Sequence, residues 1–225
     1  MLRLVRAGCY AVITAALLAS PAGADERIIR FDSDITINAD ASLLITETID
    51  VRVENRAIRR GIFRDLPTTY RDRFNNVIRV RFDVLEVLRN DTPEHWTLEN
   101  RRNGVRLRIG HADRMLDPGR HVYAITYRTT RQLGFFDNYD ELYWNVTGNG
   151  WAFPIDAATA TVHLPAGAPI VQDGAWTGRA GERGTAFQAT TEADMRMYRT
   201  TRTLAPGEGL TIAIAWPKGR ALIHN

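Results

Sequence analysis

Apolar and polar side chains alternate along most of this chain, which is the pattern of β-strands with one buried face. The longest alternating run spans residues 43–54, and its apolar face is interrupted once, by Glu47. That apolar face consists of Leu43, Ile45, Ile49, Val51 and Val53. Residues 28–37 predict a strand before this run, and Asn38-Ala39-Asp40 predicts the hairpin turn that joins the two.

The same alternation continues to the end of the chain. We expect further strands over residues 77–88, 95–99, 105–109, 122–127, 158–164, 170–177, 185–190, 198–204 and 210–216. Leu88 completes the expected apolar face of the first of these strands. Residues 55–60 predict a loop or a single helical turn, and residues 68–76 an exposed loop. Pro67 lacks a main-chain donor, so residues 61–67 cannot form a central strand.

These expected strands number roughly ten, and turn signals separate them. Apart from the N-terminal segment, no helical pattern reaches about twelve residues, the length that distinguishes a helix from a short apolar run. The sequence therefore predicts an all-β fold, an antiparallel β-sandwich, with a barrel as the alternative.

Residues 134–151 are richer in aromatic, acidic and glycine residues than any other stretch. They begin with a polar loop, Asp137 to Asp140. Beyond it, side chains alternate, with Leu142, Trp144 and Val146 on one face and Glu141, Tyr143 and Asn145 on the other. We expect a strand with Trp144 turned into the core, followed by a turn at Gly148-Asn149-Gly150, where positive φ angles are accessible.

The N-terminus has the three parts of a secretory signal peptide. Arg3 and Arg6 form a positive region, residues 7–19 are apolar, and Ala22-Gly23-Ala24 is a cleavage signal, so mature protein would begin near Asp25. A spanning helix needs about 20 apolar residues, which makes an uncleaved membrane anchor the less favoured alternative. We expect residues 1–24 to be a signal peptide, residues 25–217 one extracytoplasmic domain, and residues 218–225 a tail.

Cys9 is the single cysteine of the 225 residues and would leave with the signal peptide. The mature chain would then contain no disulfide and no thiolate site. With 44% hydrophobic and 24% charged residues, the composition is that of a globular protein able to bury a core.

The charge balance argues against nucleic-acid binding. The basic excess is nearly all arginine, with a single lysine at Lys218. Removing Arg3 and Arg6 from the 29 basic residues leaves 27 against 26 acidic residues. Nucleic-acid binding requires basic residues clustered on one face, and we interpret the local run of Arg56, Arg59, Arg60 and Arg64 as a solvated surface.

No familiar catalytic or metal-binding motif is present. The five histidines lack the spacing of metal ligands, and we expect each to be exposed and without a catalytic role. Asp137, Asn138, Asp140 and Glu141 could supply oxygen ligands to calcium, but they lack EF-hand spacing. Adjacent Asp140 and Glu141 face opposite sides of a strand, which disfavours a glycosidase pair. We therefore expect no cofactor and no metal.

The aromatic residues favour a core over a sugar-binding platform, because buried aromatics dominate sandwich interiors. We expect a ligand or interaction surface formed by the central stretch together with one arginine from the preceding segment. Its candidate residues are Arg64, Asp137, Asn138, Tyr139, Asp140, Glu141, Tyr143, Asn145 and Trp151.

Two motifs resemble a known family. Residues 133–155 read LGFFDNYDELYWNVTGNGWAFPI, and residues 60–67 read RGIFRDLP. With the strand at 28–37, they resemble the N-terminal domain of a family of predicted bacterial membrane proteins of unknown function, domain-of-unknown-function family 2207. The resemblance covers about residues 25–217.

The resemblance implies a signal peptide, an extracytoplasmic β-rich domain and then transmembrane helices, with no established catalytic residue. Because the sequence ends at Asn225 without a membrane segment, we expect a truncated form or a free periplasmic version. The expected role is a non-catalytic binding or scaffolding module in the envelope, with a membrane or envelope protein as partner. The alternative is a carbohydrate-active enzyme or other periplasmic hydrolase, which convergence of Arg64, Asp140, Glu141 and Tyr143 in one pocket would favour.

Overall fold

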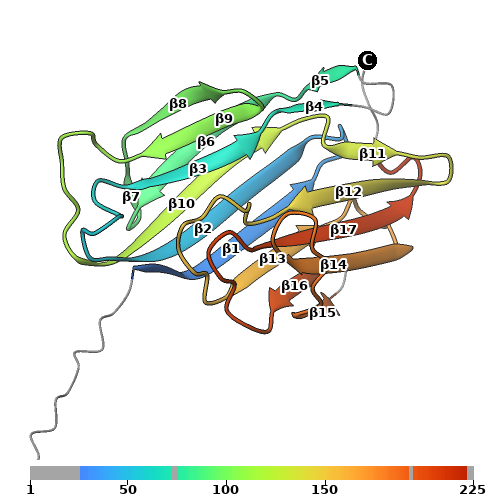
Figure 1. The fold of residues 1–225 in the computed structure, drawn as a ribbon. Helices are drawn as coiled ribbons and strands as arrows, with labels where there is room; N and C mark the ends of the chain where they lie inside the picture. The colour runs from blue at the N-terminus through green and yellow to red at the C-terminus, as the bar shows by residue number, and fades with distance from the viewer. Residues whose placement is uncertain (1–25, 72–75, 193–194, 222–225) are drawn as a thin grey trace, which may run out of the picture.

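A computed structural model describes residues 26–71, 76–192 and 195–221 (Figure 1). The expected signal peptide and the last four residues lie outside these ranges. The described residues contain seventeen strands and no helix, which confirms the all-β prediction. The strand count exceeds ten because the expected strand 77–88 is divided and short strands form in segments that were not expected to be strands.

One layer of the fold is an eight-stranded sheet in the order β15-β16-β13-β1-β2-β10-β6-β7. β1 and β13 pair in parallel, and the other neighbours pair antiparallel. Its strands are β1 (Arg27–Ile37), β2 (Leu43–Val53), β6 (Phe82–Arg89), β7 (Thr92–Pro93), β10 (Gly119–Thr129), β13 (Ala158–His163), β15 (Phe187–Glu192) and β16 (Met195–Thr200).

Two smaller sheets lie over this long sheet and form the second layer of a sandwich (Figure 1). The four-stranded sheet has the order β11-β12-β17-β14, and the three-stranded sheet the order β3-β9-β8. A two-stranded ribbon joins β4 to β5. The strands are β3 (Ile62–Pro67), β4 (Thr69–Arg71), β5 (Val77–Arg79), β8 (Trp96–Arg101), β9 (Gly104–Ile109), β11 (Leu133–Phe135), β12 (Tyr139–Asn145), β14 (Gln172–Gly178) and β17 (Gly209–Pro217).

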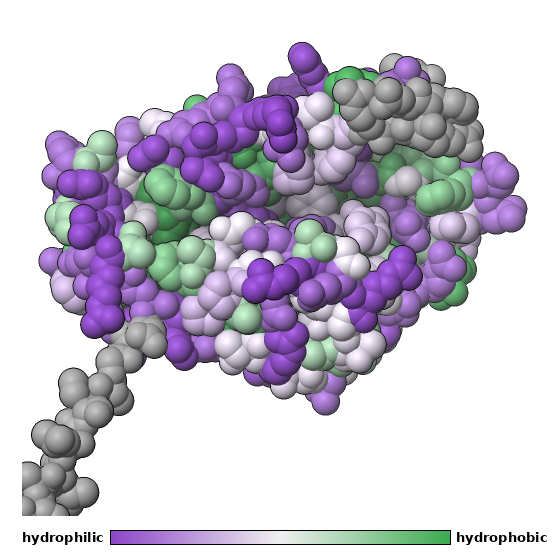
Figure 2. Space-filling view, in the orientation of Figure 1, coloured by the Kyte–Doolittle hydropathy of each residue, from purple (hydrophilic) through white to green (hydrophobic). Residues whose placement is uncertain are grey.

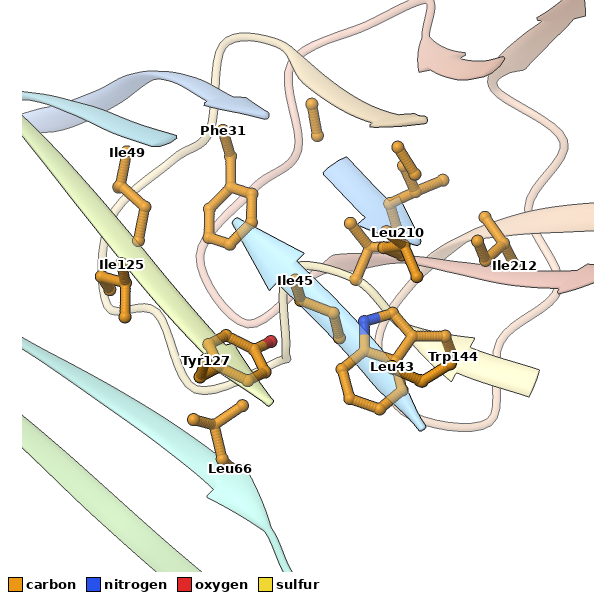
Figure 3. Close-up of a cluster of buried hydrophobic side chains, with 14 of the residues drawn as sticks. Phe31, Leu43, Ile45, Ile49, Leu66, Ile125, Tyr127, Trp144, Leu210 and Ile212 are labelled. Carbon is orange, nitrogen blue, oxygen red and sulfur yellow. The ribbon is translucent and has the colours of Figure 1, made fainter. Parts of the chain in front are cut away.

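A single apolar core fills the space between the layers. The inner face of β2 supplies the apolar residues expected from its alternation, and each is at most 1% exposed. Trp144 is 7% exposed, which confirms its expected burial. Figure 3 shows side chains of both layers in this core, among them Ile45 and Tyr127 from the long sheet and Leu66 and Leu210 from the second layer.

The region from residue 68 to residue 89 differs from the prediction. The expected loop 68–76 contains β4, which pairs with β5. The expected strand 77–88 divides into β5 and β6, and its register against β10 shifts between Thr126 and Tyr127. A β-bulge reverses which side chains point inward. As a result Val87, not Leu88, is buried, and Leu85 is 57% exposed.

Candidate functional site

A groove of about 710 Å³ lies at the seam between the three-stranded and four-stranded sheets. One wall is β3 with the neighbouring part of β9, and the other is the chain that follows β12, residues 148–153. Figure 2 shows the surface hollowed between these two sheets. Most of the lining is apolar, including Ile58, Ile62, Leu66, Trp151 and Phe153.

The groove runs along an edge strand. Among the described strands, β3 pairs with β9 on one side and has no partner on the other. The alternation of β3 places Phe63 and Asp65 outward, while Ile62, Arg64 and Leu66 are at most 5% exposed. Pro67 ends the strand, in agreement with the expectation that these residues do not form a central strand.

Arg64 lies at the base of the groove and joins β3 to both neighbouring sheets. Its Nε and Nη2 atoms donate to the carboxylate of Glu47 in β2, at 2.7 and 2.8 Å. Its Nη2 and Nη1 atoms also donate to the carbonyl oxygens of Val146 and Thr147, at 2.9 and 3.0 Å. The Tyr127 hydroxyl donates to Glu47 at 2.7 Å. This buried network holds the two walls at a set separation.

The ionisation of this network follows from its burial and pairing. Burial by itself lowers the pKa of Arg64, but the adjacent Glu47 carboxylate reverses the effect and leaves that pKa above its usual value. Burial, followed by the charge of Glu47, raises the pKa of Tyr127 well above its usual value. Tyr127 therefore stays a neutral donor and Arg64 a cation at any ordinary pH.

The opposite wall is built by polar contacts within residues 145–151. Asn145 accepts from the Gly148 main chain at 3.0 Å and donates to Asn149 at 2.7 Å. The Trp151 indole donates to the Thr147 carbonyl at 2.7 Å, beside the Arg64 contact. Gly148 has φ of +73°, and a Cβ there would lie 2.7 Å from Arg64 Nη1. Glycine is required because it avoids both the backbone strain and this contact.

Asp65, at the outer rim, is the one carboxylate among the described residues that line the groove. Arg106 donates to both Asp65 oxygens at 2.6 Å, and this hydrogen bonding lowers the pKa of Asp65. The exposed ring of Phe63 lies beneath the guanidinium groups of Arg106 and Arg108, whose centres are 5.1 and 4.8 Å from the ring centroid. Such stacking fixes the orientation of an aromatic side chain that is 47% exposed.

The structure places only part of the expected interaction surface in the groove. Arg64, Asn145 and Trp151 line it together. Arg64 and Trp151 are only 3% and 8% exposed, so the interpretation of Arg64 as part of a solvated surface was wrong. Arg64 is buried because its charge is neutralised by Glu47, and Trp151 because its ring packs edge-on to Phe31, with centroids 6.2 Å apart.

The other candidates lie elsewhere. Asp137 and Asn138 are exposed in the β11–β12 turn, and Tyr139 stacks on Phe136 with centroids 4.7 Å apart. Asp140 is completely buried, with an oxygen 3.3 Å from the Gly219 main-chain nitrogen, so its expected place on an interaction surface was also wrong. Asp140 is buried because it lies on the inward face of β12, the same face as Leu142 and Trp144.

The remaining two candidates, Glu141 and Tyr143, share the outer face of β12, where Tyr143 is 61% exposed. Asp140, Glu141 and Tyr143 do not join Arg64 in the groove. The convergence that would favour an enzyme is therefore not observed for these four residues.

Sequence reasoning did not identify Glu47, Tyr127, Asp65 or Arg106 as parts of the site. The sequence does contain a signal for the buried pair, because Glu47 and Arg64 each occupy an inward position in an alternating strand whose other inward residues are apolar. Two opposite charges at inward positions predict that they pair, because an unpaired buried charge is very costly. His121 was also expected to be exposed, but it is 6% exposed and 2.8 Å from the Asp117 carbonyl.

Neither a metal centre nor a membrane span emerges from the described part of the chain. Across residues 26–71, 76–192 and 195–221, no group of three or more potential metal ligands is assembled. In the same ranges no helix has the length and apolar character needed to cross a bilayer.

Comparison with known families decides the classification. Residues 27–216 match the family described as "Predicted membrane protein (DUF2207) N-terminal domain". The chain belongs to this family. The match confirms the resemblance drawn from residues 60–67 and 133–155, and it makes the chain a domain of a predicted membrane protein of unknown function.

A curated relative and a solved structure are similar to the chain. Uncharacterized protein YciQ of Escherichia coli K12 is 28% identical over 213 residues, which are 89% of this chain and 31% of YciQ. The chain thus spans about a third of the length of this relative. Native leukotriene A4 hydrolase from Saccharomyces cerevisiae has a TM-score of 0.52 at 12% identity, over 85% of this chain and 29% of that enzyme. At this identity the likeness concerns the fold alone.

The two family motifs meet in the groove. Residues 61–67 of the shorter motif form one wall, and residues 145–153 of the longer motif contribute to the other. Arg64 of the first motif bonds directly to the Val146 and Thr147 carbonyls of the second. Stretches about 80 residues apart in sequence therefore build one structural feature of this family member.

Proposed function

We propose that this chain is a non-catalytic binding module that faces outside the cytoplasm, and that the groove binds an extended polypeptide segment of a membrane or envelope protein. The features of a signal peptide in residues 1–24 support export. The family description supports association with a membrane protein. The peptide would add a strand beside β3.

The unpaired edge of β3 is the observation on which this proposal rests. An exposed sheet edge offers main-chain donors and acceptors to an extended peptide, and neighbouring pockets then select its alternate side chains. The six residues of β3 span about 20 Å at roughly 3.3 Å per residue. The groove volume of about 710 Å³ lies within the range of ligand sites, roughly 300–1,000 Å³.

The groove lining supports a non-catalytic role. Acid–base catalysis on a glycoside needs two carboxylates that flank one bond, whereas Asp65 is the one carboxylate among the described lining residues. Arg106 holds Asp65 ionised, which opposes service as a general acid. Histidine, serine, threonine, cysteine and lysine do not occur among those lining residues either. Such a lining suits the binding of a peptide through its main chain and its apolar side chains.

A defined peptide tests the proposal. The probe is a fluorescein-labelled six-residue peptide of alternating threonine and valine with a free C-terminus, and its binding is measured by fluorescence anisotropy. Gly150→Trp places a large ring in the groove, because a Cβ at residue 150 would face Asp65 Oδ2 at 3.9 Å. Thr190→Trp is the matched control, since exposed Thr190 in β15 is not part of the groove lining.

We expect saturable binding to the native protein and to Thr190→Trp, and a loss of about tenfold or more in Gly150→Trp, the equivalent of about 1.4 kcal/mol. Amide hydrogen exchange of residues 62–66 should slow when the peptide is bound. Equal affinity in all three proteins would overturn the proposal. Cleavage of the probe, detected by mass spectrometry, would instead support the hydrolase alternative.

A further inference from the structure

A second, smaller pocket of about 260 Å³ adjoins the groove at the start of β3. It shares Ala57, Gly61 and Phe63 with the groove lining, so a ligand along β3 reaches it directly. Four cationic or ionisable basic side chains line it, and no carboxylate occurs among its described lining residues. These four residues are Arg59, Arg60, Arg108 and His111.

Two glycines bring these basic residues together. Gly61 and Gly110 have φ angles of +138° and +117°. A Cβ on Gly61 would lie 1.7 Å from the Ile109 carbonyl oxygen, and one on Gly110 would lie 1.9 Å from the Arg60 carbonyl oxygen. The two main chains can approach this closely only without side chains. The approach places residues 59–60 beside residues 108–111.

The charges around this pocket are not balanced. Arg60 makes no hydrogen bond or ion pair with the described residues, and Arg59 donates only to the Asn55 carbonyl, at 3.2 Å. Arg108 shares Glu99 with Arg101. Glu94 is 3.7 Å from His111 but is already paired with Arg89. Within the described part of the chain, the pocket therefore has two arginines without an acidic partner, and it favours an anionic ligand.

We infer that this basic pocket binds the C-terminal carboxylate of the peptide that lies along β3. The inference rests on the proposed function and adds the orientation and end group of the ligand. A strand antiparallel to β3 ends beside Ile62, the first residue of β3, next to Gly61 of the pocket lining. A strand parallel to β3 would bring its positively charged amino terminus to the same arginines. Electrostatic repulsion therefore selects the antiparallel orientation.

The test compares the free-acid probe with the same peptide carrying a C-terminal amide. Both are measured on the native protein, on Arg60→Gln and on the double variant Arg59→Gln/Arg60→Gln. Arg102→Gln is the matched control, because Arg102 is exposed in the β8–β9 turn and lines neither pocket. Inorganic phosphate serves as a competing anion.

We expect the acid to bind the native protein and Arg102→Gln about tenfold more tightly than the amide, as for a charge-assisted hydrogen bond. This preference should fall below about threefold in the double variant, while affinity for the amide stays unchanged. Phosphate should displace the acid and leave the amide bound.

Equal affinity of acid and amide for the native protein, with both weakened by Gly150→Trp, would overturn this inference and leave the proposed function standing. Absence of binding by either peptide would overturn both. Phosphate binding that depends on Arg60, without an acid preference, would show an anion site that does not serve a peptide C-terminus.

Discussion

Arg64 of β3 and Glu47 of β2 form a buried bidentate ion pair across the two layers of the sandwich, with both donor–acceptor distances below 3 Å. The side chains are 3% and 0% exposed. The pair also anchors the chain after β12, because Arg64 donates to the Val146 and Thr147 carbonyls. One side chain thus joins all three sheets that surround the groove.

Removing one partner of this pair should destabilise the fold strongly. Glu47→Gln leaves the Arg64 charge buried without compensation, and we expect the free energy of unfolding to fall by about 3–5 kcal/mol. The double variant Glu47→Leu/Arg64→Met should lose less than the two single variants added together. Urea denaturation measures these values. The exposed Asp83 of the Arg81 pair is the control, and Asp83→Asn should cost less than about 1 kcal/mol.

Trp144→Ala should lower the free energy of unfolding by about 3–5 kcal/mol, because it removes a large ring that is 7% exposed in the core. Tyr143→Ala removes an aromatic ring from the other face of the same strand, where it is 61% exposed. That control should cost no more than about 1 kcal/mol. Native-like thermal stability of Trp144→Ala would contradict the packing described for β12.

Gly148→Ala should destabilise more than Gly181→Ala. Both glycines have positive φ, +73° and +88°, so both substitutions strain the backbone. A Cβ at Gly148 also meets Arg64 Nη1 at 2.7 Å, whereas one at Gly181 meets nothing within 4 Å. We expect Gly181→Ala to cost about 1–2 kcal/mol and Gly148→Ala clearly more. Equal urea midpoints for the two variants would show that the Arg64 side chain moves away from the added Cβ without a cost in stability.

Glu26 should make the stability of the protein dependent on pH. Its carboxylate accepts four main-chain N–H groups of residues 54–58, at 2.7 to 3.1 Å. Burial opposes its ionisation, but these four bonds prevail and lower the pKa of Glu26 below 4.5. The unfolded chain therefore binds a proton first as pH falls. The stabilisation of the fold by ionised Glu26 is complete above about pH 4.5. It is lost as pH falls through the lowered pKa of Glu26 in the folded protein.

The variant Glu26→Gln should cost about 1–3 kcal/mol at pH 7 and should flatten the decline in stability below pH 4.5. Exposed Glu86 offers the matched control, Glu86→Gln, for which we expect little change. Urea denaturation between pH 3 and pH 7 provides both measurements. An unchanged pH profile in Glu26→Gln would assign the acid sensitivity to other carboxylates.

Protein recovered from the envelope fraction of an expressing bacterium should begin near Asp25, because Ala22-Gly23-Ala24 precedes it as a cleavage signal. N-terminal sequencing provides the measurement. Recovery of the chain with Met1 intact would favour an uncleaved anchor.

The differences between expectation and structure occur where a strand depends on its partner. Residues 77–88 alternate as one strand, but pairing with β10 introduces a bulge that buries Val87 in place of Leu88. The parallel pairing of β1 with β13 also joins segments about 130 residues apart. Neither feature has a local signature, because a bulge and a pairing direction are properties of two strands together.

The sequence by itself determined most of the strands and, outside residues 77–88, their buried faces, because side chains alternate sides at every residue of an extended chain and this period is local. It also determined family membership through residues 60–67 and 133–155. Only the tertiary structure decided that these motifs form opposite walls of one groove, that Arg64 pairs with Glu47, and that β3 keeps an open edge. These are contacts between distant segments, and their geometry depends on how the whole sandwich packs.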